Sequence, residues 1–423
     1  MFSEVPFYIW ADFRNRKNIE IQRNLLSLVS FPHSPQSFWK NILPEGSAEK
    51  SWLYESESQV ATYSYRDIQA KAHCVAAYLL QNGVERGEVV VIVAETISFQ
   101  VISELGSWFA GVVTICLPEN SGAEFLNSTN NLQVKNARYL FIESAKVIRK
   151  IHPDLLQHPS LVGIISGVET GENLPLHRMV TFERVLSLGN NSWRESRSRV
   201  DERKAKPQPE DICTCDVDGS GELIPVSYAS FLLQAESIAN VILKESIEKI
   251  WVRESPVTVD QRLHACYSPL SIHLPVFYSF RDLQLPFRSE SLAFAALVTG
   301  NESLQKIYAA LSDDGKGIAG LENKKYSQAY ELTISIRECE SNHRRIPAGS
   351  KIRSTFLQRT LYRQVRKKLG KEIRSIWYGP GDVPDYVSLL FEEAGISLLQ
   401  LHPPQGAASE SRKGPVQSAS RKG

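Results

Sequence analysis

Helical and buried-strand patterns alternate between residues 62 and 142, and this alternation constrains the fold more than any other feature. A helix is expected to begin at Ser64, because Asp67 completes a capping box three residues later, and to end at Gly83. Residues 89–93 are a continuous apolar run, which is typical of a buried parallel strand. A second helix over 99–110, closed by Gly111, and strands over 112–117 and 138–142 are also predicted.

Strands and helices that alternate at this interval predict βαβ units and a parallel sheet covered on both faces. With 423 residues, of which 42% are hydrophobic, the chain is long enough to bury a core in about two lobes. The fold class expected is therefore α/β, with two doubly wound subdomains and mainly parallel sheets. The expected organisation is a peripheral segment (1–50), a first subdomain (51–190), an exposed polar linker (191–210), a second subdomain (211–405) and a disordered tail (406–423).

Composition excludes several classes of protein. A formal net charge of +1 gives no overall nucleic-acid footprint, so no nucleic-acid partner is expected. The sequence has no apolar run long enough to span a membrane, and its six scattered cysteines favour reduced thiols. A secretory leader is not expected, because residues 1–16 show no charged segment before an apolar run. The expected location is the cytoplasm, with peripheral membrane contact as an option.

The segment from Thr214 to Leu223 reads TCDVDGSGEL and occupies the position of a phosphate-binding loop. Together with Thr62 to Pro118, which carries GVxxGxxV and AGxVxxxLxP-type patterns, it resembles the AMP-forming acyl-CoA synthetases, and the long-chain fatty acid branch in particular. In that family the loop is roughly TSGTTGxPKG, whose small residues and lysine bind ATP phosphates. Here Thr214, Gly219 and Ser220 are the retained candidate cofactor-binding residues, and Glu222 stands in the place of the lysine.

The resemblance continues downstream with fewer matching residues. His273, in SPLSIH, resembles the histidine of the family's LPLSH turn and is a candidate substrate-binding residue, although a structural histidine is the commoner outcome. Gly379 and Gly381, in YGPG, occupy the place of the glycine turn before the adenine pocket, or are only a tight turn. The family's YGxTE motif and its C-terminal domain have no counterpart, so no catalytic residue is assigned.

Two metal hypotheses remain open for the loop. Asp216, Asp218 and Ser220 match the first half of a calcium loop, but position twelve is Ser227 instead of a glutamate, so a solvated acidic turn is the alternative. Cys213 and Cys215 lack a second ligand pair for zinc and are expected to be two strand thiols on one face. No metal ligand is assigned.

Basic residues concentrate between 344 and 374, where eleven lysines and arginines accompany one acid. Leucine and valine recur there every four residues, which predicts a helix with a cationic outer face. The functional interpretation is contact with an anionic membrane surface or an acidic protein, and the alternative is a solvated helix. The candidate contact residues are Arg359, Arg363, Arg366 and Lys367.

The resemblance and its departures lead to two main hypotheses. The first is a non-catalytic binding or regulatory partner in fatty-acid or acyl metabolism, which acts beside an active synthetase. The second is an active acid–thiol ligase that forms acyl-AMP and acyl-CoA with parts supplied by another chain, and only this hypothesis requires ATP, Mg²⁺ and CoA. A decaying reading frame is a third hypothesis.

Overall fold

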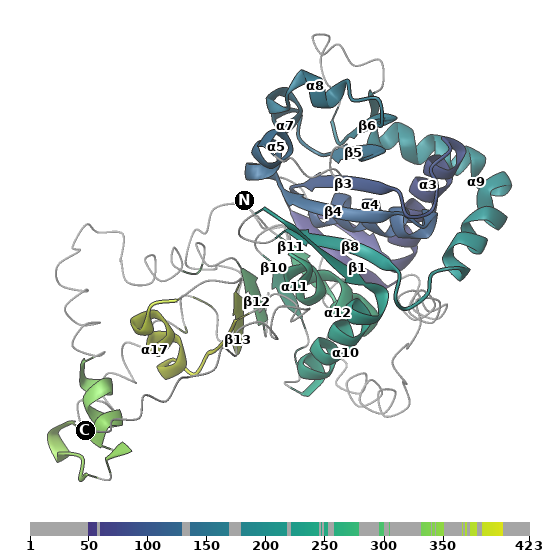
Figure 1. Cartoon of the computed structure of the whole chain (residues 1–423). Coiled ribbons are helices and arrows are strands. Elements are labelled where there is room, and N and C mark those ends of the chain that lie inside the picture. The colour runs from purple at the N-terminus through teal and green to yellow at the C-terminus, as the bar shows by residue number, and fades with distance from the viewer. Residues whose placement is uncertain are drawn as a thin grey trace, which may run out of the picture.

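The computed structural model describes residues 50–56, 60–128, 136–168, 179–217, 221–244, 247, 249–252, 258–278, 296–299, 304, 331–339, 341–342, 344–350, 366, 369, 373–378 and 383–400. Its described strands form two mostly parallel sheets of seven strands each (Figure 1). The expected α/β class with two parallel-sheet lobes is confirmed.

Sheet I has the order β7-β6-β5-β3-β4-β8-β9, and only its last pair is antiparallel. The register is continuous through the centre, where Val91 of β3 lies opposite Ile115 of β4 and Leu140 of β5. The strands are β3 (Val89–Ala94), β4 (Val113–Pro118), β5 (Tyr139–Ile142), β6 (Gly163–Ser166), β7 (Met179–Thr181), β8 (Ile212–Val217) and β9 (Leu223–Ser227).

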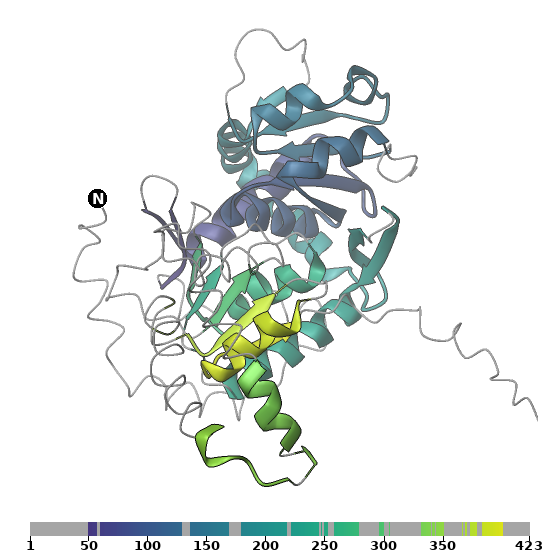
Figure 2. The ribbon, with the colours of Figure 1, turned by 90° about the vertical axis from the view of Figure 1, so that its left-hand side faces the viewer.

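Sheet II has the order β14-β13-β12-β10-β11-β1-β2, and its antiparallel pair is β1 with β2. Figure 2 shows α17 (Asp385–Glu393), in yellow, beside the last strands of this sheet. The strands are β1 (Ser51–Ser56), β2 (Val60–Ser64), β10 (Ile250–Val252), β11 (Val276–Tyr278), β12 (Ala296–Thr299), β13 (Ser375–Tyr378) and β14 (Ser397–Gln400).

The assignment of strands to the two sheets differs from the expected subdomain boundaries. β1 and β2 precede all of sheet I in sequence, yet β1 pairs with β11 of sheet II. In the same way β8, which falls within the expected second subdomain, pairs with β4 of sheet I. Sheet II is therefore assembled from two separate stretches of chain, 51–64 and 250–400, whereas sheet I comes from one stretch, 89–227. A division at residues 190 and 211 separates neither sheet cleanly.

The first two helices form where the sequence predicts them. Helix α3 (Tyr65–Gln81) begins with the capping box, in which the Asp67 N–H donates to Ser64 Oγ and the Ser64 N–H donates to Asp67 Oδ2 at 2.8 Å. Helix α4 (Ile97–Ala110) ends at Gly111, whose φ of 81° is left-handed and suits a residue without Cβ. Further helices in the described part of the chain include α5 (Glu119–Ser128), α7 (Ala145–Lys150), α8 (Pro153–Leu156), α10 (Tyr228–Lys244), α11 (Val259–Arg262) and α12 (Ser268–Ser271).

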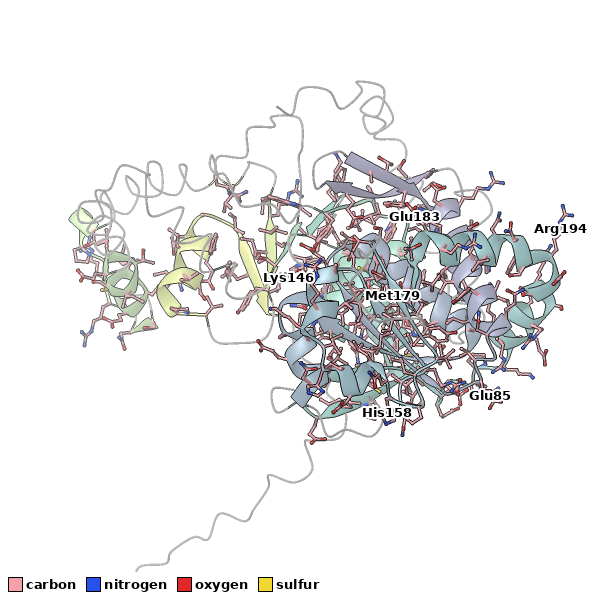
Figure 3. The ribbon with its side chains drawn as sticks, turned by 90° about the horizontal axis from the view of Figure 1, so that it is seen from above. Glu85, Lys146, His158, Met179, Glu183 and Arg194 are labelled. Atoms are coloured by element: carbon pink, nitrogen blue, oxygen red, sulfur yellow. The ribbon has the colours of Figure 1, made fainter. Side chains whose placement is uncertain are left out.

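Helix α9 (Phe182–Ala205) replaces most of the linker expected over 191–210. Its buried residues, Val185, Gly189, Ser192, Ser196 and Val200, recur every three or four positions and form a narrow stripe of small side chains. This stripe lies against α3, and Figure 3 shows Arg194 on the opposite, solvent side. The expectation of a linker over 191–210 is wrong for most of that range. The buried stripe of α9 is narrow and contains few apolar residues, so the segment has the polar composition that is typical of a linker although it forms a packed helix.

One large apolar cluster joins the two sheets. It includes Val90 and Ile92 of sheet I together with Ile250 and Val276 of sheet II. Continuous burial of this kind holds the two lobes together in the described part of the chain. In that same part, no helix is both long and apolar enough to cross a bilayer.

Candidate functional site: a buried polar network beneath the loop

The candidate loop is the turn of the β8–β9 hairpin. Val217 lies opposite Leu223, so residues 218–222 connect the two antiparallel strands. Gly221 has a left-handed φ of 85°, and Glu222 is exposed beside it. Asp218, Gly219 and Ser220 lie outside the described residues. The assignment of Gly219 and Ser220 as cofactor-binding residues therefore remains a prediction.

Thr214 lies at the base of the hairpin and is fully buried. Its Oγ1 donates to the carbonyl oxygen of Thr114 on β4 at 3.0 Å and accepts from Nη2 of Arg262 at 3.1 Å. These contacts place the hydroxyl inside the protein, where it links two neighbouring strands to α11. A direct contact with a nucleotide, as the resemblance implies for this residue, requires that the hydroxyl leave both partners.

Arg262 and Glu104 form a buried ion pair at the centre of this network, and their side chains are 1% and 0% exposed. Glu104 Oε2 also accepts from the hydroxyl of Tyr267 at 2.6 Å, and Oε1 accepts from Thr114 Oγ1 at 3.0 Å. A buried pair of charges is tolerated only when further hydrogen bonds satisfy it. Here both oxygens of Glu104 and both terminal nitrogens of Arg262 have partners, and among the described residues Arg262 Nε has none. The network therefore links α4 of the first lobe to the helical segment that packs on the second.

The segment that carries Arg262 is helical from α11 through a π-helical turn, η4 (Leu263–Tyr267), to α12. The wider π turn places Tyr267 within reach of Glu104. Such turns are rare and occur often at functional sites. No pattern in the sequence assigns a role to Arg262 or Tyr267. Glu104 does indicate a buried polar partner, because a single carboxylate inside an otherwise apolar helix requires one.

Asp216 is buried on β8 and is not part of a solvated turn. Its Oδ2 accepts from the N–H of Val259 at 3.3 Å, at the beginning of α11. Burial raises the pKa of Asp216, although Arg262 opposes the change. Burial also raises the pKa of Asp260 to about 7, and the nearby Asp216 adds to that effect. Among the described residues, no group of three or more His, Cys, Asp or Glu side chains is arranged to hold a metal ion.

Cys213 and Cys215 do not share one face of the strand. Cys213 packs in the large core between the sheets, whereas Cys215 packs in a smaller cluster with Val91 and Ile115. The pairing of β8 with β9 shifts between Ile212 and Thr214, which marks a bulge. The expectation of a shared face assumed strict alternation, and a bulge breaks that alternation.

His273 lies just after α12, in a turn with a left-handed φ of 58°. Its ring stands edge-on to the ring of Tyr65, with 5.3 Å between centroids. Its backbone N–H donates to the backbone carbonyl of Leu270. The residue is half-buried beside the beginning of α3. Its proposed contact with substrate remains a prediction.

Arg366, a candidate membrane contact, binds backbone carbonyls. Its Nε donates to Ala394 at 2.7 Å, its Nη1 donates to Ile373 at 2.8 Å, and its Nη2 donates to Gly395. The guanidinium thus joins the end of α17 to the beginning of β13. The remaining basic candidates Arg359, Arg363 and Lys367, and the turn glycines Gly379 and Gly381, lie outside the described residues.

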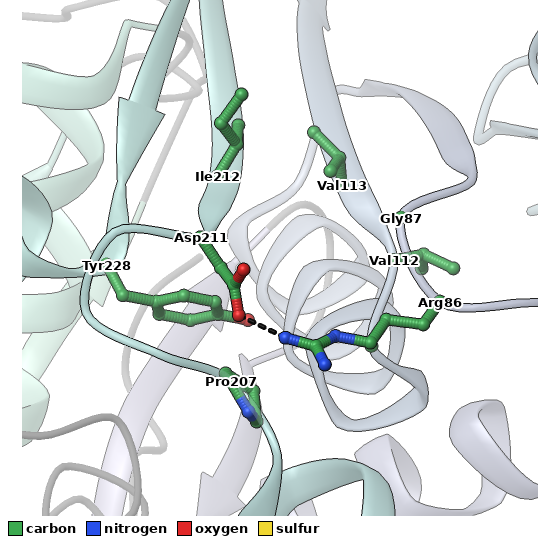
Figure 4. A pocket seen from close by; sticks show the side chains of 9 residues that line it. Arg86, Gly87, Val112, Val113, Pro207, Asp211, Ile212 and Tyr228 are labelled. Carbon is green, nitrogen blue, oxygen red and sulfur yellow. Dashed lines mark hydrogen bonds and ion pairs between the residues drawn. The ribbon is translucent and has the colours of Figure 1, made fainter.

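A pocket of about 240 Å³ opens at the end of sheet I that lies opposite the β8–β9 turn (Figure 4). It lies beside the amino ends of β3, β4 and β8, whereas ligands of open α/β sheets bind at the carboxyl ends. Arg86 and Asp211 form an ion pair across it, and Val112, Val113 and Ile212 supply apolar walls. No pattern in the sequence predicts this pocket.

The sequence of residues 46–217 matches the family model of the AMP-binding enzymes. This part of the chain is similar to the AMP-binding enzymes. No curated protein matches its sequence significantly.

Several solved structures share the fold of this chain. A benzoate CoA ligase from Burkholderia xenovorans LB400 is 14% identical with a TM-score of 0.54, and the match covers 87% of this chain and 60% of that one. The anthranilate CoA ligase AuaEII is 12% identical with a TM-score of 0.53, over 88% and 59%. The A-PCP didomain of the carboxylic acid reductase from Segniliparus rugosus is 10% identical with a TM-score of 0.55, over 88% and 52%. The chain thus spans about three-fifths of the length of the first two ligases.

Proposed function

We propose that this protein is a non-catalytic binding or regulatory relative of the acyl-activating ligases, which acts in fatty-acid or acyl metabolism. The observation that carries the proposal is the state of the loop at the β8–β9 hairpin. Glu222 presents an exposed carboxylate in the place of the family's phosphate-binding lysine. Thr214, at the base of the same loop, has its hydroxyl bound by Arg262 and Thr114.

Electrostatics supports the proposal. Acyl-AMP formation requires groups that stabilise the negative charge developing on the phosphates of ATP. A carboxylate in the place of a lysine changes the local charge by two units and repels those phosphates. Asp216, a third residue of the loop segment, accepts a hydrogen bond from the backbone N–H of Val259 in α11. Its carboxylate likewise offers no hydrogen-bond donor to a phosphate.

The first experiment is acid-dependent exchange of labelled pyrophosphate into ATP, with a panel of fatty and aromatic acids. An active acyl-CoA ligase serves as the positive control. We expect exchange no greater than the blank without enzyme. Exchange well above that blank contradicts the proposal and favours the acid–thiol ligase, with ATP, Mg²⁺ and CoA as its cofactors and substrates.

A charge-reversal variant tests the role of the loop directly. Glu222→Lys restores the positive charge and is expected to strengthen the binding of MgATP, measured by calorimetry. Glu210→Lys is the matched control, since it makes the same change of charge on an exposed residue before the amino end of β8. The six-residue strand separates the two positions by about 20 Å at roughly 3.3 Å per residue. Equal effects of both variants indicate general electrostatics and exclude a specific role for Glu222.

A further inference from the structure

Lys204, in the last turn of α9, lies against a cluster of rings from three helices. Its Nζ is 3.3 Å from Nε2 of His73 on α3 and 4.5 Å from the ring centroid of Phe109 on α4. His73 in turn stacks on Trp193 of α9, with 4.6 Å between centroids and 24° between planes. The amine is therefore fixed in position while its side chain remains only partly buried.

Burial disfavours a positive charge on Lys204, whereas the face of the Phe109 ring favours one. Burial lowers the pKa of His73 to about 3, and Lys204 and Arg197 add to the effect, so the imidazole is neutral at physiological pH. Burial likewise lowers the pKa of Lys204, against a weaker opposite influence from Asp201. Asp201 is itself paired with Arg197 at 3.8 Å. A lysine in such a place is a stronger nucleophile at neutral pH than one in water.

We propose that Lys204 is a nucleophilic lysine that becomes acylated by activated acyl compounds, of which acyl phosphates are the simplest. The amine nitrogen forms a bond to the carbonyl carbon, and the bond between that carbon and the phosphate oxygen breaks. The phosphate leaves with the electron pair and takes up the proton that the amine releases. His73 is a positioning residue, because its Nε2 accepts one N–H of the neutral amine and fixes the direction of the lone pair.

Acetyl phosphate and the full chain provide the test, with initial rates measured for each lysine by peptide mass spectrometry. The internal control is Lys206, which lies two residues further on at the surface and is paired with Glu202. We expect Lys204 to react faster than Lys206 at pH 7.5, since a lowered pKa raises the fraction of neutral, nucleophilic amine. The rate at Lys204 also reaches its plateau at a lower pH. Equal rates and equal pH profiles at the two lysines overturn the proposal and leave Lys204 as an ammonium packed on Phe109.

His73→Phe separates positioning from packing, because a phenyl ring keeps the stack with Trp193 and removes the acceptor nitrogen. The expected result is a severalfold slower reaction at Lys204, an unchanged reaction at Lys206 and an unaltered circular dichroism spectrum. An unchanged rate at Lys204 overturns the positioning role of His73. Lys204→Arg is expected to abolish the fast-forming adduct, and its persistence overturns the assignment to this residue.

Discussion

Glu55 shows how one side chain ties the two lobes together. It lies on β1 of sheet II, and its Oε1 accepts from the N–H of Ile97 at 2.9 Å at the beginning of α4. Its other oxygen accepts from the hydroxyl of Ser98. Burial raises the pKa of Glu55 to about 7, against the lowering effect of these hydrogen bonds and with a further rise from the nearby Glu143.

This raised pKa predicts a pH dependence of stability. The folded state keeps a proton on Glu55 that the unfolded state releases between about pH 4.5 and 7, so this contribution falls as the pH rises through that window. Glu55→Gln mimics the protonated form: its amide oxygen can accept from the Ile97 N–H, and its NH2 group can donate to the Ser98 hydroxyl, which then acts as the acceptor. We expect it to flatten the pH dependence and to raise the free energy of unfolding at pH 8 by on the order of 2 kcal/mol.

Urea unfolding at pH 5, 6, 7 and 8 measures the effect. Glu195→Gln, on the exposed side of α9, is the matched control for removing a carboxylate. An identical pH slope in the wild type and Glu55→Gln shows that another group is responsible.

The buried pair of Glu104 and Arg262 predicts strong energetic coupling. Arg262→Met leaves the carboxylate of Glu104 without its charged partner, and we expect a loss of about 3–5 kcal/mol in the free energy of unfolding. The double variant Glu104→Leu, Arg262→Met removes both charges and is expected to lose less than the single variant. Chemical denaturation of all four proteins in the cycle checks this, and additive losses contradict the coupling.

At the scale of elements, short-range signals in the sequence were reliable. Ser64 with Asp67, the apolar run at 89–93 and Gly111 each act within a few residues, and each marks an observed boundary of a helix or strand. Helix α9 was missed because its buried face is made of small residues that add little hydrophobicity. Partners more than a hundred residues apart, such as Glu104 and Arg262, depend on the tertiary fold and were not predictable from local pattern.

The crossing of α9 and α3 yields a prediction about one glycine. A Cβ on Gly189 would lie 1.9 Å from the carbonyl oxygen of Cys74, which is a backbone atom and has little freedom to move. Gly189→Ala is therefore expected to force the two helices apart and to destabilise the protein by about 2–3 kcal/mol or more. The matched control is Gly349→Ala, since nothing lies within 4 Å of the corresponding Cβ. Thermal melting compares them, and equal melting temperatures contradict the close packing.

At the scale of the whole molecule, the placement of β1 and β2 makes the two lobes interdependent. These two strands belong to sheet II, although all its other described strands follow sheet I in sequence. Sequence patterns identified two parallel sheets but not this placement, because a strand's pattern does not specify its neighbours. The polar network around Arg262 and the contact of Glu55 with α4 both join the two lobes.

The basic segment between 344 and 374 yields the last prediction, which is that the protein binds membranes that contain anionic lipid. Arg366 holds three backbone carbonyls, so its replacement is expected to damage the fold and must be excluded from the test. The informative variant changes Arg359, Arg363 and Lys367 to glutamine and keeps Arg366. Each basic residue near an anionic surface adds about 1 kcal/mol of attraction, so three changes are expected to reduce liposome binding at least tenfold.

Flotation with vesicles of neutral and anionic composition, at low and high salt, measures this binding. The expected binding requires anionic lipid and weakens as salt screens the charges. A triple change to glutamine at Arg194, Arg197 and Arg199, on exposed positions of α9, is the control for removing the same charge elsewhere. If both triple variants lose binding equally, net charge is sufficient to explain it. If the wild type binds neutral vesicles equally well, or binds none, the segment is a solvated face.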